Sequence, residues 1–198
     1  MIKLKKFLAV LVLASSFFAG GAFAGVTGET GEKRDFSSEL LGGMWHASPM
    51  LGSGWSLRLS FLDDSTFIYA ASEMDGETRE RFIKGEWSVS PEGLLTLFCR
   101  EALMWEGGEV VPAMGSMGTE TEIMNAEMVK VKYDPVKEVE IHVGDYVYDD
   151  STPRPWKIYL QDGGAIWGGS GWWWKYEGDL DLEDFLSDYK SADIEAEE

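Results

Sequence analysis

Few residues of this sequence have the types and spacing that catalysis requires. It contains no Gly-x-Ser-x-Gly elbow of the serine hydrolases, no His-Glu-x-x-His zinc motif and no phosphate-binding P-loop. The two histidines, His46 and His142, are too few for a His-rich metal site, and we expect them to be exposed or capped at strand ends. We therefore predict neither an enzyme nor a bound metal or cofactor.

Sulfur and carboxylate side chains are the remaining candidate ligands. Met114 and Met117, with Met44 and His46, have the soft donors that Cu(I) prefers, but methionine is also the common filler of irregular apolar gaps. Paired aspartates, such as those at 63–64, fall in predicted turns, where aspartate is favoured by its local hydrogen bonds. We expect no metal site from either set.

The single cysteine excludes an intramolecular disulfide. Cys99 lies in an apolar run and is expected to be a small buried hydrophobic residue. A reactive thiol would need a nearby positive charge, and Arg100 is the candidate for it. Stability must then come from an apolar core.

The first 24 residues have the features of a secretory signal peptide. Three lysines precede an apolar stretch from Phe7 to Phe18, and Ala22-Phe23-Ala24 is a small-x-small cleavage site. We expect cleavage after Ala24 and export to the periplasm or the exterior, with no transmembrane segment in the mature chain. The apolar stretch is short for a membrane span.

The mature chain is strongly acidic. The net charge of −18 becomes −21 once the leader, with its three lysines and no acid, is removed. This charge disfavours nucleic acids and anionic membranes and favours solubility or a cationic protein partner. We expect a monomer.

Short strands are predicted along most of the chain. Trp55, Leu57, Leu59 and Phe61 alternate with polar residues, the pattern of a strand with one buried face. About eight to ten such strands follow one another at hairpin spacing, including a predicted hairpin across Asp134-Pro135, which favours a sandwich or barrel.

Two halves of the chain share a sequence pattern. Residues 59–67 resemble residues 158–166, and Gly85-Glu86-Trp87 resembles Gly171-Trp172-Trp173. A duplicated run of strands suits closure into a barrel, because closure removes exposed sheet edges. We therefore predict an all-β, antiparallel up-and-down barrel that is internally duplicated.

Three parts of the sequence lack the alternating strand pattern: the segment before the predicted barrel, a segment in its middle and the C-terminal segment. Residues 25–38 are expected to form a flexible leader, residues 39–190 the barrel, and residues 191–198 an acidic tail. Within the barrel, residues 101–121 show no clear period and are expected to form a long loop, either a lid at the mouth of the barrel or a linker between the two repeated halves. A one-sided apolar stripe predicts a helix over about residues 182–190. The stripe consists of Leu182, Phe185, Leu186 and Tyr189.

Gly43-Met44-Trp45 ahead of this meander, with a C-terminal helix, resembles the lipocalins and lipocalin-like (calycin-type) bacterial domains. The resemblance implies that Trp45 plugs one end of the barrel. It also implies that a late basic residue packs over Trp45, and Lys175 is the candidate in the last strand. The family fold is a cup that holds a small apolar ligand.

The tryptophans extend this expectation. Trp45, Trp55 and Trp87 are expected in the core. Strand alternation places Trp173 on one face and its two neighbours on the other. That outward pair either binds a sugar, peptide or partner, or is covered by the C-terminal helix, which we prefer.

We predict an exported protein that binds a small apolar or amphipathic ligand in a barrel cavity. The residues expected at the site are Trp55, Leu57, Leu59 and Phe67 on the wall, and Trp105, Met114 and Met117 on a lid formed by residues 101–121. The alternative is a barrel without a cavity that acts through its acidic surface as an envelope interaction or inhibitor protein.

Overall fold

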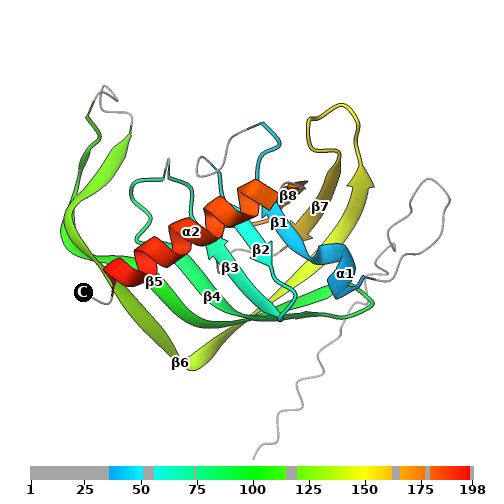
Figure 1. Cartoon of the computed structure of the whole chain (residues 1–198), viewed down its shortest axis with the longest axis horizontal. Helices are drawn as coiled ribbons and strands as arrows, with labels where there is room; N and C mark the ends of the chain where they lie inside the picture. Colours follow the sequence, from blue (N-terminus) through cyan, green and yellow to red (C-terminus); the bar gives the residue numbers. More distant parts are fainter. Residues whose placement is uncertain are drawn as a thin grey trace, which may run out of the picture.

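The chain folds into a closed antiparallel β-barrel (Figure 1). The computed structural model describes residues 36–50, 56–73, 75–114, 120–161, 166–176 and 179–196. Each strand of the described chain pairs with its neighbour in sequence, and the last strand pairs with the first to close the ring. The predicted up-and-down barrel with a C-terminal helix is confirmed. The predicted signal peptide lies outside the described residues.

The described residues contain eight strands and two helices, joined by turns. Their bounds are α1 Ser38–Leu41, β1 Gly43–His46, β2 Arg58–Phe61, β3 Thr66–Ala70, β4 Glu80–Val89, β5 Leu94–Pro112, β6 Thr121–Tyr148, β7 Trp156–Gln161, β8 Gly171–Tyr176 and α2 Asp179–Glu195. No helix among these residues is long and apolar enough to cross a bilayer.

The barrel interior is packed with large apolar side chains. Leu59 and Phe67 are fully buried there, as are most inward residues of the other strands, including Trp45 and Trp173. Burying a side chain of this size stabilises the fold by roughly 1.5–3 kcal/mol. The period-2 alternation of the strands therefore supplies the core.

Trp45 closes one end of this core beneath the short helix α1. Its indole Nε1 donates to the Leu41 carbonyl oxygen at 2.8 Å. The Lys175 ammonium lies 5.5 Å from the centre of the Trp45 ring and donates to the Leu40 carbonyl oxygen at 3.2 Å. A cation over an indole face is attractive, and the same lysine satisfies a helix-end carbonyl. Lys175 thus has the place expected for the late basic residue.

Helix α2 lies across the outer face of the barrel (Figure 1). Phe185 and Tyr189 are buried against outward residues of the strands, among them Phe82 and Tyr176. The Arg58 guanidinium, also buried, donates to Asp188 of the helix at 3.0 Å. Hence α2 is fixed by both apolar and charged contacts.

The helix differs from prediction in length and in position. It spans Asp179–Glu195 and so includes most of the residues expected as an acidic tail. Phe185, Leu186 and Tyr189 of its stripe pack on the outward cluster around Met44, Ile68 and Phe82, and among the described side chains this cluster does not include the outward tryptophans Trp172 and Trp174. The expectation that α2 covers this pair is therefore wrong.

Residues 101–121 are not the long irregular loop that the sequence suggested. β5 continues to Pro112 and β6 begins at Thr121, and the two strands pair from Glu101 to Pro112. Gly107 and Gly108 have positive φ angles of 70° and 69°. Glycine adopts this conformation without strain, so the strand changes direction here and its alternation is lost from the sequence.

The predicted hairpin at Asp134-Pro135 is also wrong. β6 runs without interruption from Thr121 to Tyr148, and the peptide bond before Pro135 is cis. The ladder with β5 shifts register between Cys99 and Glu101, where the opposite strand inserts several extra residues. The Asp-Pro signal marks this irregularity in one strand and not a reversal of the chain.

Equivalent tryptophans of the two repeated segments point in the same direction, but some equivalent positions differ in secondary structure. Trp87 and Trp173, which are equivalent in the repeat, are both buried in the inner core. Residue 166, however, lies in a turn where the first copy has strand β3. Residues 180–182 lie in α2 where the first copy has β5. Five strands thus come from the first copy and three from the second.

Candidate functional site

A hollow of about 340 Å³ lies at the end of the barrel where β1 ends and β8 begins. We call it the rim hollow. Its volume is in the range of small-molecule sites, and aromatic walls are typical of them. The lining residues are Ala47, Leu57, Trp167, Gly168, Gly169, Ser170, Gly171, Trp172, Trp173 and Trp174.

Glycines keep the rim hollow open. A Cβ atom placed on Gly171 would meet no atom of the described residues within 4 Å, and the same is true of Gly168 and Gly169. The last two also have positive φ angles of 85° and 143°, which a side chain would strain. The glycine-rich turn before β8 therefore combines a required backbone shape with free space beside the tryptophans.

The structure brings few of the predicted site residues together. Leu57 lines the rim hollow, whereas Leu59 and Phe67 are fully buried in the core behind it. Trp105 lies on the outer face of the barrel, and Met114 is 98% exposed. Trp55 and Met117 lie outside the described residues.

Trp105 lines a second hollow of about 290 Å³ between α2 and the barrel. Two arginines, Arg58 and Arg81, share this hollow with Asp188. Because Arg58 already donates to Asp188, the charges here hold the helix in place. We assign this hollow a structural role.

The buried histidine His46 lies on the outer face at the end of β1. Its ring stacks on Tyr176 with centroids 3.7 Å apart, and the Arg154 guanidinium carbon lies 4.0 Å from the centre of the same Tyr176 ring. Both groups are so close to one ring centre that they must occupy opposite faces. Tyr176 is therefore held between an imidazole and a guanidinium.

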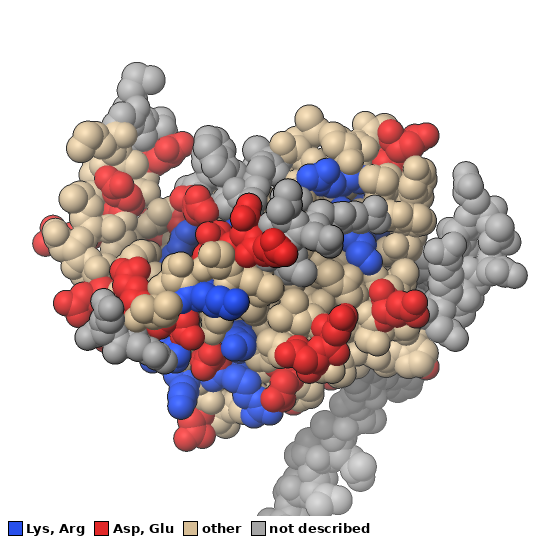
Figure 2. All heavy atoms as spheres, viewed as in Figure 1, with Lys and Arg blue, Asp and Glu red and all other residues tan. Residues whose placement is uncertain are grey.

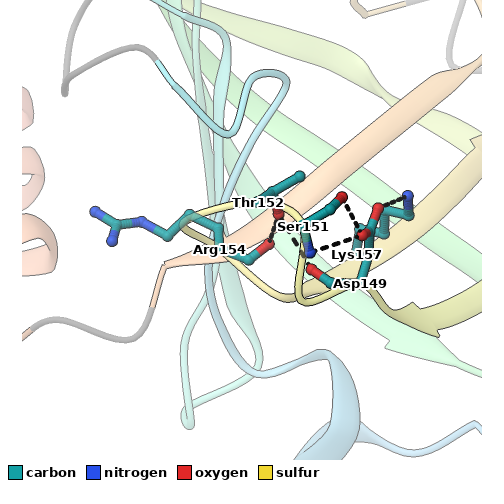
Figure 3. Close-up of polar contacts among 5 residues, drawn as sticks. All are labelled: Asp149, Ser151, Thr152, Arg154 and Lys157. Atoms are coloured by element: carbon teal, nitrogen blue, oxygen red, sulfur yellow. Dashed lines mark hydrogen bonds and ion pairs between the residues drawn. The ribbon is translucent and has the colours of Figure 1, made fainter.

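A tight turn between β6 and β7 places Arg154 (Figure 3). Asp149 accepts hydrogen bonds from Lys157 at 2.7 Å and from the Ser151 hydroxyl at 2.5 Å, and these partners lower the pKa of Asp149 to about 2. The Thr152 hydroxyl donates to the Arg154 carbonyl oxygen at 2.6 Å. Figure 3 shows that the Arg154 side chain points away from these contacts.

His46 was expected to be exposed or capped, and this prediction is wrong. The residue is fully buried, and neither ring nitrogen has a hydrogen-bond partner among the described residues. Burial, reinforced by the charges of Arg58 and Arg154, lowers the pKa of His46 to about 3. The imidazole is neutral at pH 7 and sealed from solvent, so it is not placed to exchange protons with a substrate.

Cys99 is buried in the barrel core, as predicted. Burial raises the pKa of its thiol. Arg100 points to the surface, where it forms an ion pair with Glu86 at 2.6 Å. The thiol is therefore protonated at neutral pH, which disfavours a nucleophilic role.

The tryptophans of the rim hollow were only partly identified from sequence. Trp172, Trp173 and Trp174 were recognised as a surface of interest, but Trp167 was not. The signal that would have found it is the glycine-rich run directly after it, since such a run before a strand leaves space next to aromatic side chains.

No three His, Cys, Asp or Glu side chains of the described chain lie together as a metal would require. In the comparisons with known proteins, neither a family model nor a curated protein nor a solved structure matched the chain.

Proposed function

We propose that the protein is an exported, lipocalin-like binding protein that holds a small apolar or amphipathic molecule in the rim hollow. The observation that carries this proposal is the hollow of about 340 Å³ with four tryptophans in its lining. Indole rings provide a large apolar area that loses little side-chain freedom on binding.

The packed core limits the ligand to the rim. Leu59, two residues along the chain from Leu57 of the hollow, is fully buried among other core residues, and so is Phe67 deeper in the barrel. A long acyl chain therefore has no path past these side chains. A compact molecule with a flat apolar face suits the site better.

The lipocalin-like assignment rests on the end of the barrel beneath α1. Gly43 opens β1, Trp45 fills the interior, and Lys175 of β8 lies over its ring. Helix α2 on the outside adds to the likeness. These features together support the family resemblance more strongly than the Gly-x-Trp motif alone.

Binding is tested by titration of the purified mature chain with a fluorescent apolar probe, followed by displacement with compact aromatic molecules. Tryptophan emission reports occupancy directly, because four tryptophans line the hollow. We expect saturable probe binding and quenching of this emission. A signal that rises linearly with probe concentration would argue against the site.

Replacing Gly171 by leucine is expected to raise the dissociation constant of the probe at least tenfold. The new side chain starts in open space beside the tryptophans, so it fills the hollow without displacing backbone. Isothermal titration calorimetry measures the change. The thermal midpoint should remain close to that of the parent protein.

A matched control is Ser88→Leu, which adds the same side chain at an exposed position of β4. Its probe affinity should equal that of the parent. Equal affinities of Gly171→Leu and the parent would place the probe elsewhere.

A further inference from the structure

The distal parts of β5 and β6 form a ribbon that leaves the barrel. We call residues 105–114 and 120–128 the arm; it rises at the left of Figure 1. β4 pairs with β5 only as far as Met104, and β7 pairs with β6 only from His142 onward. Within the described chain, the two arm strands therefore pair with each other and with no third strand, apart from one isolated bridge between Gly76 and Glu122.

The arm exposes apolar side chains on both of its faces. Val110 is 50% exposed, Met124 is 47% exposed and Met114 is 98% exposed. Val110 pairs with Ile123, whereas Met124 pairs with Glu109, the neighbour of Val110. Val110 and Met124 therefore project from opposite faces of the arm. A two-stranded ribbon is marginally stable alone, and covering these faces would stabilise it.

The charge of the arm is of one sign. Its residues, 105–114 and 120–128, include five glutamates and three methionines, with no lysine or arginine. Figure 2 shows acidic side chains along the arm at the upper left, whereas the basic residues of this view lie elsewhere. Two arms would repel each other, which disfavours a second copy of the arm as the covering partner.

The edges of the arm are partly blocked. At its base, the Arg79 guanidinium donates to the carbonyl oxygens of Trp105 and Gly107 at 3.2 and 2.6 Å. On the other strand, towards the tip, Gly76 bridges Glu122, and the Thr121 hydroxyl donates to Glu77 at 2.6 Å. Strand addition is therefore hindered on both edges, and recognition falls to side chains on a face of the ribbon.

We propose that the arm is a docking surface for a basic amphipathic segment of a partner protein. Val111 and Met124, which share one face of the arm with Glu109 and Glu122, would contact the apolar side of the segment, and these glutamates would attract its lysines or arginines. Methionine suits this role because its flexible, polarisable side chain adapts to different apolar surfaces. The proposal does not depend on ligand binding in the rim hollow.

A synthetic peptide of alternating lysine and leucine repeats, designed as an amphipathic helix, tests the proposal on the mature chain. We expect saturable binding that weakens with added salt, and amide shifts in NMR spectra that concentrate in the arm. Val111→Thr/Met124→Thr and Glu109→Gln/Glu122→Gln should each raise the dissociation constant at least tenfold. Glu138→Gln/Glu140→Gln, two exposed glutamates elsewhere on β6, should leave it unchanged.

Several outcomes would overturn the proposal. If polylysine binds as tightly as the lysine–leucine peptide, charge alone drives the binding. If a glutamate–leucine peptide of the same design binds, the acidic charge of the arm does not select the partner. Shifts centred on the rim hollow would place the peptide at the other site. A dimer in sedimentation that the Val111→Thr/Met124→Thr variant dissociates would identify a second copy as the partner.

Discussion

Replacing Trp45 by alanine is expected to lower the free energy of unfolding by about 3–5 kcal/mol, the loss typical of a large buried aromatic side chain. Trp45 is fully buried, donates to the Leu41 carbonyl oxygen at 2.8 Å and carries Lys175 over its ring. The substitution leaves a cavity and removes the partner of that carbonyl. Since single domains are stable by about 5–15 kcal/mol, this is a large share of the total.

Urea denaturation followed by far-UV circular dichroism measures the effect. Trp172→Ala is the matched control, because Trp172 is a half-buried, outward residue of β8, and its loss should cost only about 1 kcal/mol. If Trp45→Ala does not fold, Trp45→Phe keeps an aromatic ring and should still lose roughly 1–2 kcal/mol. Equal losses at Trp45 and Trp172 would show that Trp45 does not close the barrel.

The barrel itself was predictable because its strands alternate between a buried and an exposed face. Leu59 and Phe61 both point inward, as their period-2 spacing predicts, and so do Ile158 and Leu160 in the second half. Alternation of this kind needs no knowledge of tertiary contacts. Closure was predictable from the duplication and the hairpin order of the strands.

The arm could not be predicted in the same way. Gly107 and Gly108 in β5 and Asn125 in β6 all have positive φ angles, and Gly107 pairs with Ala126 next to Asn125. Both strands therefore turn together at one level, which interrupts the alternation in each sequence. From sequence alone, such a paired corner is indistinguishable from a loop.

The site was only partly predictable for a related reason. Leu57 and Leu59 are two residues apart in one alternating run, yet only Leu57 lines the rim hollow while Leu59 is sealed behind it. The difference depends on how far along the barrel each residue lies, which is set by the register with the neighbouring strands. The spacing of residues in the sequence predicts which face of the sheet a side chain occupies, but not how deep in the barrel it lies.

Replacing His46 by phenylalanine is expected to remove a large acid sensitivity of the fold. The folded protein holds the pKa of His46 near 3, against 6.5 for an ordinary histidine. Between these values the unfolded chain binds a proton that the folded chain refuses, so stability falls as the pH drops from about 6.5 toward 3. Above pH 6.5 both states are neutral and the effect vanishes.

The expected loss from His46 alone is about 2–3 kcal/mol at pH 4.5 relative to pH 7, at roughly 1.4 kcal/mol for each pH unit. Phenylalanine retains an aromatic ring to stack on Tyr176 and removes two buried nitrogens that have no hydrogen-bond partner in the described part of the chain. Urea denaturation of both proteins at pH 7, 5.5 and 4.5 gives the difference directly, and the carboxylates, common to both chains, cancel in it.

The slope of this difference separates titration from packing. A misfit of phenylalanine would shift its stability by the same amount at every pH, whereas the loss of a buried neutral histidine makes the variant progressively more stable than the parent as the pH falls. His142→Phe is the matched control, because His142 is exposed on β6. Its stability should follow the parent at all three pH values. Parallel curves for His46→Phe and the parent would mean that His46 gains its proton freely in the folded barrel, and the sealed stack of His46, Tyr176 and Arg154 would then have to open to water.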